Sequence, residues 1–343
     1  MSKKVTTQSP KLYIGIDIHK KTWKVHFCTD MTEGAGKSMP PNPEALNSHV
    51  AKCYDGYEVA VAYEAGCCGY TAARSFKEYG WETLVVNAAD IPRPAKQGVI
   101  KTDKIDAKNI AKQLRSNTLK SITIPEVQRE CLRSLTRHRT NLVKDLRRIK
   151  SRIKSHLLYY GIEIPEEYDN PNWSKSFLEW LGEIQWNYVT IDIAFSGMLA
   201  VYRFNQAQVN EISNRIRAYC RRHHKQDYSL LRSIPGIGPL TAAYIIAEVG
   251  DIRRFTSFKK FAGYIGIIPG IHSSGESSRT TGTTPRCNRI IRSMIVESSW
   301  VTIRIDPAMQ NYYRSHAGKD SKAVIFKVAR KLLSRMYAVI HYE

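Results

Sequence analysis

The first 116 residues alternate short apolar runs with helical patterns, and this order restricts the folds open to the chain. Residues 11–18 and 22–29 alternate or run apolar, as adjacent strands do. A Gly- and Pro-containing stretch at 31–42 predicts a weak third strand. The elements expected after it are a helix at 43–54, a strand at 57–64, a helix at 70–79, a strand at 83–87 and a helix at about 102–116. Strands that alternate with helices predict a partly parallel α/β sheet.

Four acidic residues lie where these elements end or begin. Asp17 and Glu64 close apolar, β-rich runs, in which an isolated charge is costly. Asp103 and Asp106 stand three apart at the expected start of a helix, so they share one helical face. The alternative is that Asp103 is a favourable charge at a helix N-terminus and Asp106 a surface acid. We expect the four carboxylates to converge at one sheet edge and to bind Mg²⁺, which prefers oxygen ligands.

Basic residues dominate the charge of the chain. The 52 Lys and Arg face 31 Asp and Glu, which gives a formal net charge of +21 and a pI near 9.7 and favours a nucleic acid as partner. With 343 residues, 43% of them hydrophobic, the chain can form two or three domains. No apolar run reaches the roughly 18 residues of a membrane span, and residues 1–10 lack the apolar core of a secretory signal. We therefore expect a cytoplasmic protein with no membrane partner.

Several cofactor-binding patterns are missing from the sequence. The seven cysteines are odd in number and show neither CxxC nor zinc-ligand spacing, which predicts reduced thiols rather than disulfides or a zinc module. Neither GxGxxG nor the GxxxxGKS or GxxxxGKT pattern occurs, so no nucleotide cofactor is expected.

Residues 129–154 change to a helical pattern with one apolar stripe and an otherwise cationic surface. The segment holds ten Lys and Arg against Glu130 and Asp145, and like charges at that density destabilise a free helix. Nucleic-acid phosphates would neutralise them, and the alternative is an ordinary solvated helix face. The residues expected to bind nucleic acid here are Arg133, Arg137, Lys144, Arg147, Arg148 and Lys154. A second helical stretch at about 190–224 is expected to pair with the first as an antiparallel coiled-coil hairpin.

Pro-Gly-Ile-Gly at residues 235–238, followed by an apolar helix, is typical of a helix-hairpin-helix turn. Its glycines, Gly236 and Gly238, let the backbone approach a phosphate, and the next helix offers free N–H groups at its N-terminus. An ordinary tight turn between packed helices is the alternative. Two helices, at about 286–304 and 320–340, are expected to close the chain.

A loop rich in Ser, Thr and Gly is expected at residues 272–286. Its candidate nucleophiles and the arginines near them are Ser273, Ser274, Ser277, Ser278, Arg279, Arg286, Arg289 and Arg292. Arginines can hold a phosphate and stabilise charge while a serine attacks it. The alternative is a solvated Ser/Gly loop with no chemistry.

These motifs, in this order, resemble the DEDD transposases of bacterial insertion sequences, the IS110 family of bridge-RNA-guided recombinases. YIGIDIHKK, YEAGCCGY and KTDKIDAKNIAKQL look like its RuvC-like motifs, and the order of strands and helices matches an RNase H-like (RuvC-like) fold. RSIPGIGPLTAAYIIAEVGDIRRFTSFKKFAGYIGIIP followed by HSSGESSR looks like its C-terminal transposase domain. The resemblance covers nearly the whole chain, although TTGTTPRCNRIIR lacks the Lys-x-Gly that often follows in the family.

The resemblance implies a specific chemistry. The metal-binding DEDD positions correspond to Asp17, Glu64, Asp103 and Asp106. Ser274 matches the nucleophilic serine, with Ser273 as the neighbouring alternative. The family is expected to cleave DNA through a covalent 5′-phosphoserine link and to exchange strands, guided by a noncoding RNA that pairs with donor and target DNA. Magnesium as cofactor and assembly as dimers to tetramers, with active sites shared between subunits, are also implied.

The expected organisation is an α/β plus α protein in three parts. These are a RuvC-like DEDD domain at 1–125, a basic helical coiled-coil region at 126–226, and a mainly helical transposase domain with the serine at 227–343. The expected function is a DNA transposase or recombinase. Two alternatives remain open: a RuvC-like, metal-dependent and structure-selective nuclease that uses water, and a noncatalytic nucleic-acid-binding scaffold.

Overall fold

The computed structural model describes residues 9–91, 103–170, 173–274, 277–284, 287–316, 318 and 320–342, with the backbone alone at 103–104 and 269–283. The chain divides into two compact units, residues 1–124 and 125–343. Among the described helices, none is both long enough and apolar enough to cross a membrane.

The first unit is built on a five-stranded sheet with the strand order β3-β2-β1-β4-β5. Its strands are β1 (Lys11–Ile18), β2 (Trp23–Thr29), β3 (Glu33–Met39), β4 (Glu58–Glu64) and β5 (Glu82–Val86). The first three strands pair antiparallel and are joined by short connections. β1, β4 and β5 are parallel neighbours, and a helix precedes β4 and another precedes β5 in the chain. This mixed sheet confirms the predicted α/β architecture, including the weak third strand, and fits an RNase H-like domain.

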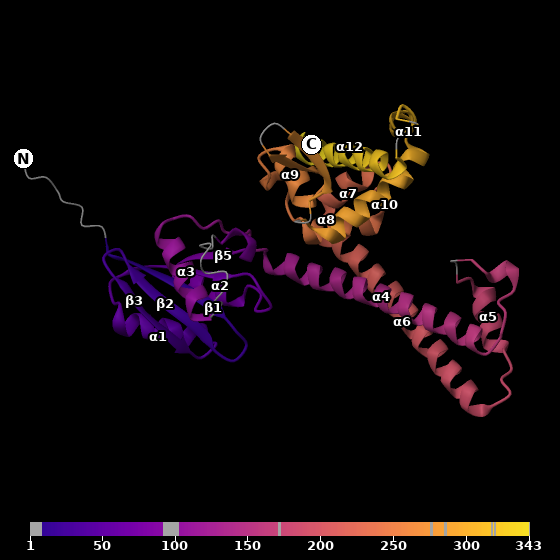
Figure 1. Ribbon diagram of the computed structural model, residues 1–343, viewed down its shortest axis with the longest axis horizontal. Helices are drawn as coiled ribbons and strands as arrows, with labels where there is room; N and C mark the ends of the chain where they lie inside the picture. Colours follow the sequence, from indigo (N-terminus) through magenta and orange to yellow (C-terminus); the bar gives the residue numbers. More distant parts are fainter. Residues whose placement is uncertain are drawn as a thin grey trace, which may run out of the picture. The chain divides into compact units, whose positions relative to one another are not determined.

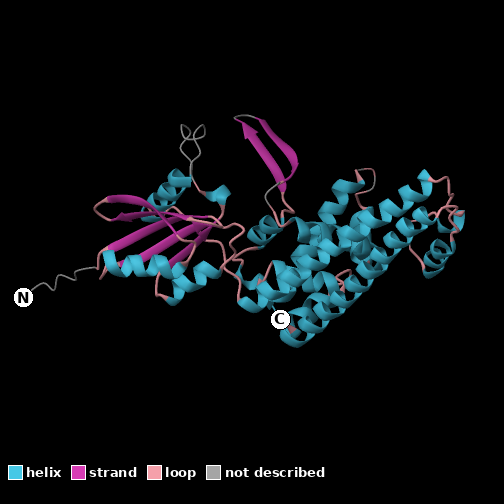
Figure 2. Ribbon diagram, turned by 90° about the horizontal axis from the view of Figure 1, so that it is seen from below, coloured by secondary structure: helices cyan, strands magenta, loops and turns pink. Residues whose placement is uncertain are grey.

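Helices cover both faces of this sheet (Figure 1, Figure 2). They are α1 (Pro43–Cys53), α2 (Thr71–Glu78) and α3 (Asp103–Arg115), close to the predicted bounds. Successive strand residues point to opposite faces, so the sheet contributes to two cores. Ile14 and Ile16 pack in the core under α1 and α2, whereas Ala60 and Ala62 pack in the core under α3.

The second unit is mainly helical and contains a long helical hairpin (Figure 1). Its helices, α4 (Val127–Tyr159) and α6 (Val189–His223), lie side by side and run antiparallel, in agreement with the predicted pairing. Leu132 and Ile216 share one core, and Ile153 and Phe195 share another farther along the hairpin. A short helix that was not predicted, α5 (Lys175–Glu183), packs in this second core.

Several of the remaining helices of the second unit share a core with the helical hairpin. The remaining elements are α7 (Lys225–Ser233), α8 (Pro239–Glu248), α9 (Phe258–Ile265), β6 (Pro269–Ser274), β7 (Ser277–Thr283), α10 (Arg289–Ile305), α11 (Pro307–Arg314) and α12 (Ser321–Tyr342). Ile245 of α8 and Leu332 of α12 belong to the same core as Leu132 and Ile216 of the hairpin. The predicted second and third parts therefore form one compact unit, and a boundary at 226–227 stays a prediction.

The prediction of a loop at 272–286 is wrong for the residues that the structure describes. β6 and β7 form an antiparallel hairpin, in which Ser273 pairs with Ser278 and Ser274 with Ser277. Threonine is β-branched and favours strand geometry, and the run after 279 is rich in it. High Ser and Gly content predicts a loop, but it is equally compatible with a two-stranded ribbon. We call β6 and β7 the serine hairpin.

Candidate active site

Asp17 and Glu64 lie at neighbouring positions at the carboxyl ends of two parallel strands. β1 and β4 pair in register up to Ile16 and Tyr63, so the next residues along each strand are Asp17 and Glu64. Both belong to the sheet face under α3, because the residues two positions earlier lie against that helix or its core. The side chain of Asp17 is only 19% exposed.

Helix α3 packs directly on β1 at Gly15. A β-carbon at this position would stand 2.2 Å from the Ala107 carbonyl oxygen and 2.4 Å from the Ala111 nitrogen, so only glycine allows the contact. Lys112 of the same helix forms an ion pair of 2.7 Å with Glu33 of β3. The hydrogen bond from Lys112 holds the pKa of Glu33 below its usual value. These contacts fix α3 on the sheet.

The direction of α3 brings the other two acids to the edge that holds Asp17. Its last turn, at Leu114, lines a cavity with Tyr13, near the start of β1. The helix therefore runs antiparallel to β1, and its first turn lies where β1 and β4 end. Asp103 begins this turn and the half-buried Asp106 follows three residues later. The side chain of Asp103 lies outside the described part of the structure.

The donor groups at this edge are carboxylate oxygens, which suit a hard divalent cation such as magnesium. Asp17 also contacts its neighbour His19, with 3.1 Å between Oδ2 and Nε2. Among the described side chains, no three His, Cys, Asp or Glu groups form a metal site. The carboxylate donors fit magnesium in their chemistry, and the predicted set also includes Asp103.

The serine hairpin carries the predicted nucleophile beside its tip. Ser274 is the last residue of β6, and Ser273 precedes it. Of the arginines predicted near it, Arg279 lies in β7, Arg289 begins α10, and Arg286 lies outside the described residues. The fold therefore places the two candidate serines at consecutive strand positions, and their side chains lie outside the described part.

Two of the predicted nucleic-acid-binding arginines of the long helix α4 are engaged by other groups of the protein, although the side chain of Arg137 is 56% exposed. Arg137 donates two hydrogen bonds, of 2.8 and 3.0 Å, to the carboxylate of Glu248. Arg133, whose side chain is 17% exposed, donates to the backbone carbonyls of Ala247 and Glu248. An internal carboxylate thus neutralises charge that the sequence pattern assigns to phosphates. Nucleic-acid binding by these two arginines stays a prediction.

The other predicted contacts on α4 face solvent. Arg148 and Lys154 form surface ion pairs, of 2.8 and 3.3 Å, with acids of the same unit. Surface pairs contribute little to stability, so a competing phosphate can displace them. Lys144 and Arg147 are exposed as well. These four cations are available to a polyanion without the loss of a buried pair.

The predicted helix-hairpin-helix turn lies between α7 and α8. Gly236 has a φ of +92°, and a β-carbon there would stand 2.0 Å from Thr302 Oγ1 of α10. Packing against α10 therefore requires this glycine, so its expected role in approaching a phosphate is not needed to explain it. Gly238, the N-cap of α8, has open space around it and no side-chain cap. It lines a cavity of about 800 Å³ together with Arg147, and a phosphate contact there stays a prediction.

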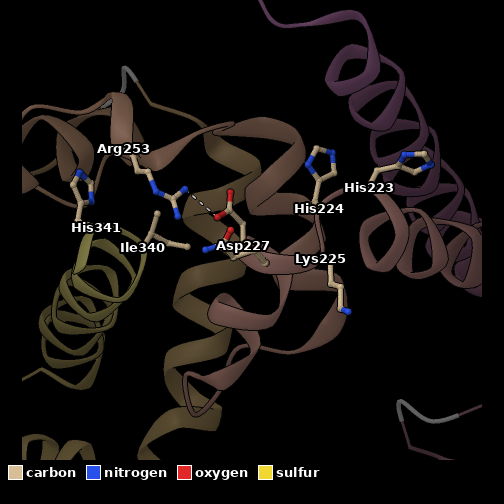
Figure 3. Close-up of a pocket in the computed structure, with 8 residues that line it drawn as sticks. His223, His224, Lys225, Asp227, Arg253, Ile340 and His341 are labelled. Carbon is tan, nitrogen blue, oxygen red and sulfur yellow. Dashed lines mark hydrogen bonds and ion pairs between the residues drawn. The ribbon is translucent and has the colours of Figure 1, made fainter. Parts of the chain in front are cut away.

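A basic run at residues 221–225, Arg-Arg-His-His-Lys, joins α6 to α7 and was not predicted as functional, although it is visible in the sequence. Its last three residues line a cavity of about 480 Å³ with Arg253 and His341 (Figure 3). Arg253 is held by Asp227 at 2.9 Å. Burial lowers the pKa of His224, which favours its neutral form.

Comparison with known proteins assigns this arrangement to one family. Residues 14–162 match a model for DEDD transposases of the IS110 type, and residues 228–314 match the transposase IS116/IS110/IS902 family. A protein of Sinorhizobium fredii named y4qE is 28% identical over 82% of this chain and 75% of its own length. The transposase for insertion sequence element IS1533 of Leptospira borgpetersenii is 26% identical over 71% of each chain. The pilin gene-inverting protein of Moraxella bovis is 33% identical over 33% of this chain and 36% of its own length.

The two matched regions contain the residues predicted to act in catalysis. The first includes Asp17, Glu64, Asp103 and Asp106, and the second includes Ser274. The mixed sheet with acids at its edge and the helical unit with its serine hairpin agree with these matches. The chain therefore belongs to the IS110 family of DEDD transposases.

Proposed function

We propose that this protein is a DNA recombinase that cleaves and exchanges strands through a covalent phosphoserine intermediate. The observation that carries the proposal is the placement of Asp17, Glu64 and the first turn of α3 at one sheet edge, in a transposase of net charge +21. The candidate nucleophile is Ser274 of the serine hairpin. Nucleophilic catalysis by serine divides strand exchange into two transfers of similar energy.

The residues proposed to hold magnesium are Asp17, Glu64, Asp103 and Asp106. A bound ion supplies positive charge to a scissile phosphate and favours ionisation of an attacking hydroxyl. Ser274 Oγ forms a bond to phosphorus while the bond from phosphorus to the 3′-oxygen breaks. The proton that the serine loses is balanced by the one that the 3′-oxygen gains. The covalent link preserves the phosphodiester for religation to another 3′-hydroxyl.

The proposed guide is a noncoding bridge RNA that pairs with donor and target DNA, so that base pairing selects the sequence. Exposed cations on α4, with those at 221–225, provide contacts for nucleic-acid backbones. Assembly as a dimer to tetramer belongs to the same proposal. The name of the pilin gene-inverting relative supports strand exchange, because inversion of a gene requires it.

A covalent-trapping experiment tests the proposal. The full-length protein is incubated with labelled element-end DNA, the element's RNA and magnesium, and is then run on a denaturing gel. A labelled protein adduct is expected with the wild type and with Ser273→Ala but not with Ser274→Ala. Loss of the adduct only in Ser273→Ala would identify Ser273 as the nucleophile.

The same gel separates the alternatives. Efficient cleavage by Ser274→Ala without any adduct would establish a metal-dependent nuclease that uses water. Binding without cleavage by the wild type, unchanged in Asp17→Asn, would establish a noncatalytic scaffold. Either result would overturn the proposed recombinase.

A further inference from the structure

A polar cluster forms around a buried carboxylate and includes Asn288, which follows the serine hairpin in the chain. The Glu248 cluster consists of Arg133, Arg137, Glu248 and Asn288. Glu248, the last residue of α8, is only 2% exposed, and a buried carboxylate is stable only when it is paired and hydrogen-bonded. Arg137 donates to both of its oxygens, and Asn288 Nδ2 donates to Oε2 at 3.3 Å. The carboxylate therefore links helix α4 to Asn288.

Asn288 is held by both ends of its side-chain amide. Its Oδ1 accepts a hydrogen bond of 3.2 Å from the backbone nitrogen of Ile291 and so caps helix α10. Its backbone nitrogen donates to the carbonyl oxygen of Tyr264 at 3.2 Å. Because Nδ2 is used by Glu248, rotation of the amide would break two hydrogen bonds at once. Asn288 lies between the end of the serine hairpin and the start of α10.

Side-chain hydrogen bonds hold both chain segments that flank the serine hairpin. Arg292 of α10 donates to the carbonyl oxygen of Thr284 at 2.9 Å, after β7. Arg330 donates to the carbonyl oxygen of Ile267 at 3.0 Å, before β6. Gly266 has a φ of +84°, and a β-carbon there would stand 2.2 Å from the Cβ of Cys287. The segment that enters the hairpin thus presses against the segment that leaves it.

We propose that Glu248 and Asn288 are positioning residues that fix the base of the serine hairpin to helix α4. Arg137 orients the carboxylate, the carboxylate orients the amide of Asn288, and Asn288 sets where the hairpin ends and α10 begins. The catalytic consequence rests on the proposed function, because the position of the hairpin matters for chemistry only if its serine attacks DNA. The mechanical consequence, a tightly held hairpin base, is independent of that function.

The test exchanges donor and acceptor across the Asn288–Glu248 contact. Asn288→Asp keeps an oxygen to cap α10 but sets a second carboxylate against Glu248. Amide hydrogen exchange in residues 268–284 should accelerate at least about tenfold, since a hydrogen bond to a charged group is removed. Adduct formation at saturating DNA should slow by a similar factor, with DNA affinity unchanged. Adding Glu248→Gln restores one donor facing one carboxylate, so the double variant should recover most of both losses.

A matched control separates positioning from a general loss of stability. Arg139→Ala removes the 2.7 Å hydrogen bond from Arg139 Nε to Ser213 Oγ, from the same helix, and should leave exchange in the hairpin unchanged. Wild-type exchange in Asn288→Asp, or a double variant no better than the worse single one, would overturn the proposal. If Asn288→Asp unfolds the protein, the proposal is tested by whether the double variant regains folding and slow hydrogen exchange in the hairpin. If the wild type forms no adduct, the proposed function fails, while the exchange data still decide on positioning.

Discussion

Each of the two units contains shielded carboxylates, and their surroundings differ. In the first unit, the register of parallel strands sets Asp17 beside Glu64, and like charges side by side are costly without a cation. In the second unit, Glu248 is enclosed by Arg137, Arg133 and an amide donor. Burial of an acid is therefore not what marks a candidate site in this protein. The two sites differ in the source of the positive charge that balances the acid. Arginines of the fold balance Glu248, and we propose that magnesium balances the acids at the sheet edge.

The largest expected effect concerns the paired acid. Glu248→Ala leaves positive charge without its buried partner and should destabilise the second unit by about 3–5 kcal/mol. Glu58→Ala is the control, since it removes only an exposed pair with Lys11 at 4.0 Å and should cost less than about 1 kcal/mol. Urea unfolding of both variants measures the difference. Equal costs would mean that the Glu248 cluster adds no more stability than a surface pair.

Substitution of an acid at the sheet edge of the first unit should reduce activity with little loss of stability. Asp17→Asn removes a proposed magnesium ligand and should slow strand cleavage at least about a hundredfold, because a bound metal contributes several kcal/mol to the transition state. Glu58→Gln, which removes an exposed acid of the same sheet paired with Lys11, should cleave normally. Single-turnover cleavage and magnesium titration by calorimetry check both. Normal cleavage by Asp17→Asn would make the sheet edge structural.

The next largest effect concerns the packing of helix α3 on the sheet. Gly15→Ala places a methyl group into the backbone of this helix and should cost about 1–3 kcal/mol, the usual cost of overpacking. It should also reduce cleavage, because the turn with Asp103 and Asp106 shifts away from Asp17. Gly36→Ala is a suitable control, as its β-carbon would meet nothing nearer than His26 Nδ1 at 3.4 Å. Thermal unfolding and the cleavage assay should separate the two variants, and equal behaviour would contradict the close packing.

The smallest effect concerns nonspecific binding. Replacing Arg221, Arg222 and Lys225 by Gln should weaken binding to duplex DNA or RNA and reduce the salt dependence, by about 0.9 in the log–log slope for each phosphate that the variant no longer neutralises. Arg139→Gln is the control, because that arginine is half-buried and donates a 2.7 Å hydrogen bond to Ser213 Oγ. Fluorescence anisotropy at several salt concentrations measures the slopes. An unchanged slope in the triple variant would exclude this run from the interface.

Local patterns were sufficient to predict the elements of the first unit. Alternating apolar runs identified its strands, and the acids at the ends of two of them suggested the site. The serine hairpin was missed because Ser, Thr and Gly content does not distinguish a solvated ribbon from a loop. The internal role of Arg137 was missed because Glu248 lies far from it in the chain and carries no local signal.

The sequence by itself determined the types of chemistry available: carboxylates at strand ends, a basic surface, serines near arginines and the family to which they point. Only the tertiary structure decided which of these groups meet. Strand register set Asp17 beside Glu64, and the absence of a side chain at Gly15 let α3 bring Asp106 to the same edge. The physical reason is that partners distant in the chain are selected by packing and pairing across the whole fold, which residue periodicity does not encode. For the same reason, a charge that looks available for DNA in the sequence, such as Arg137, can be neutralised by a buried acid.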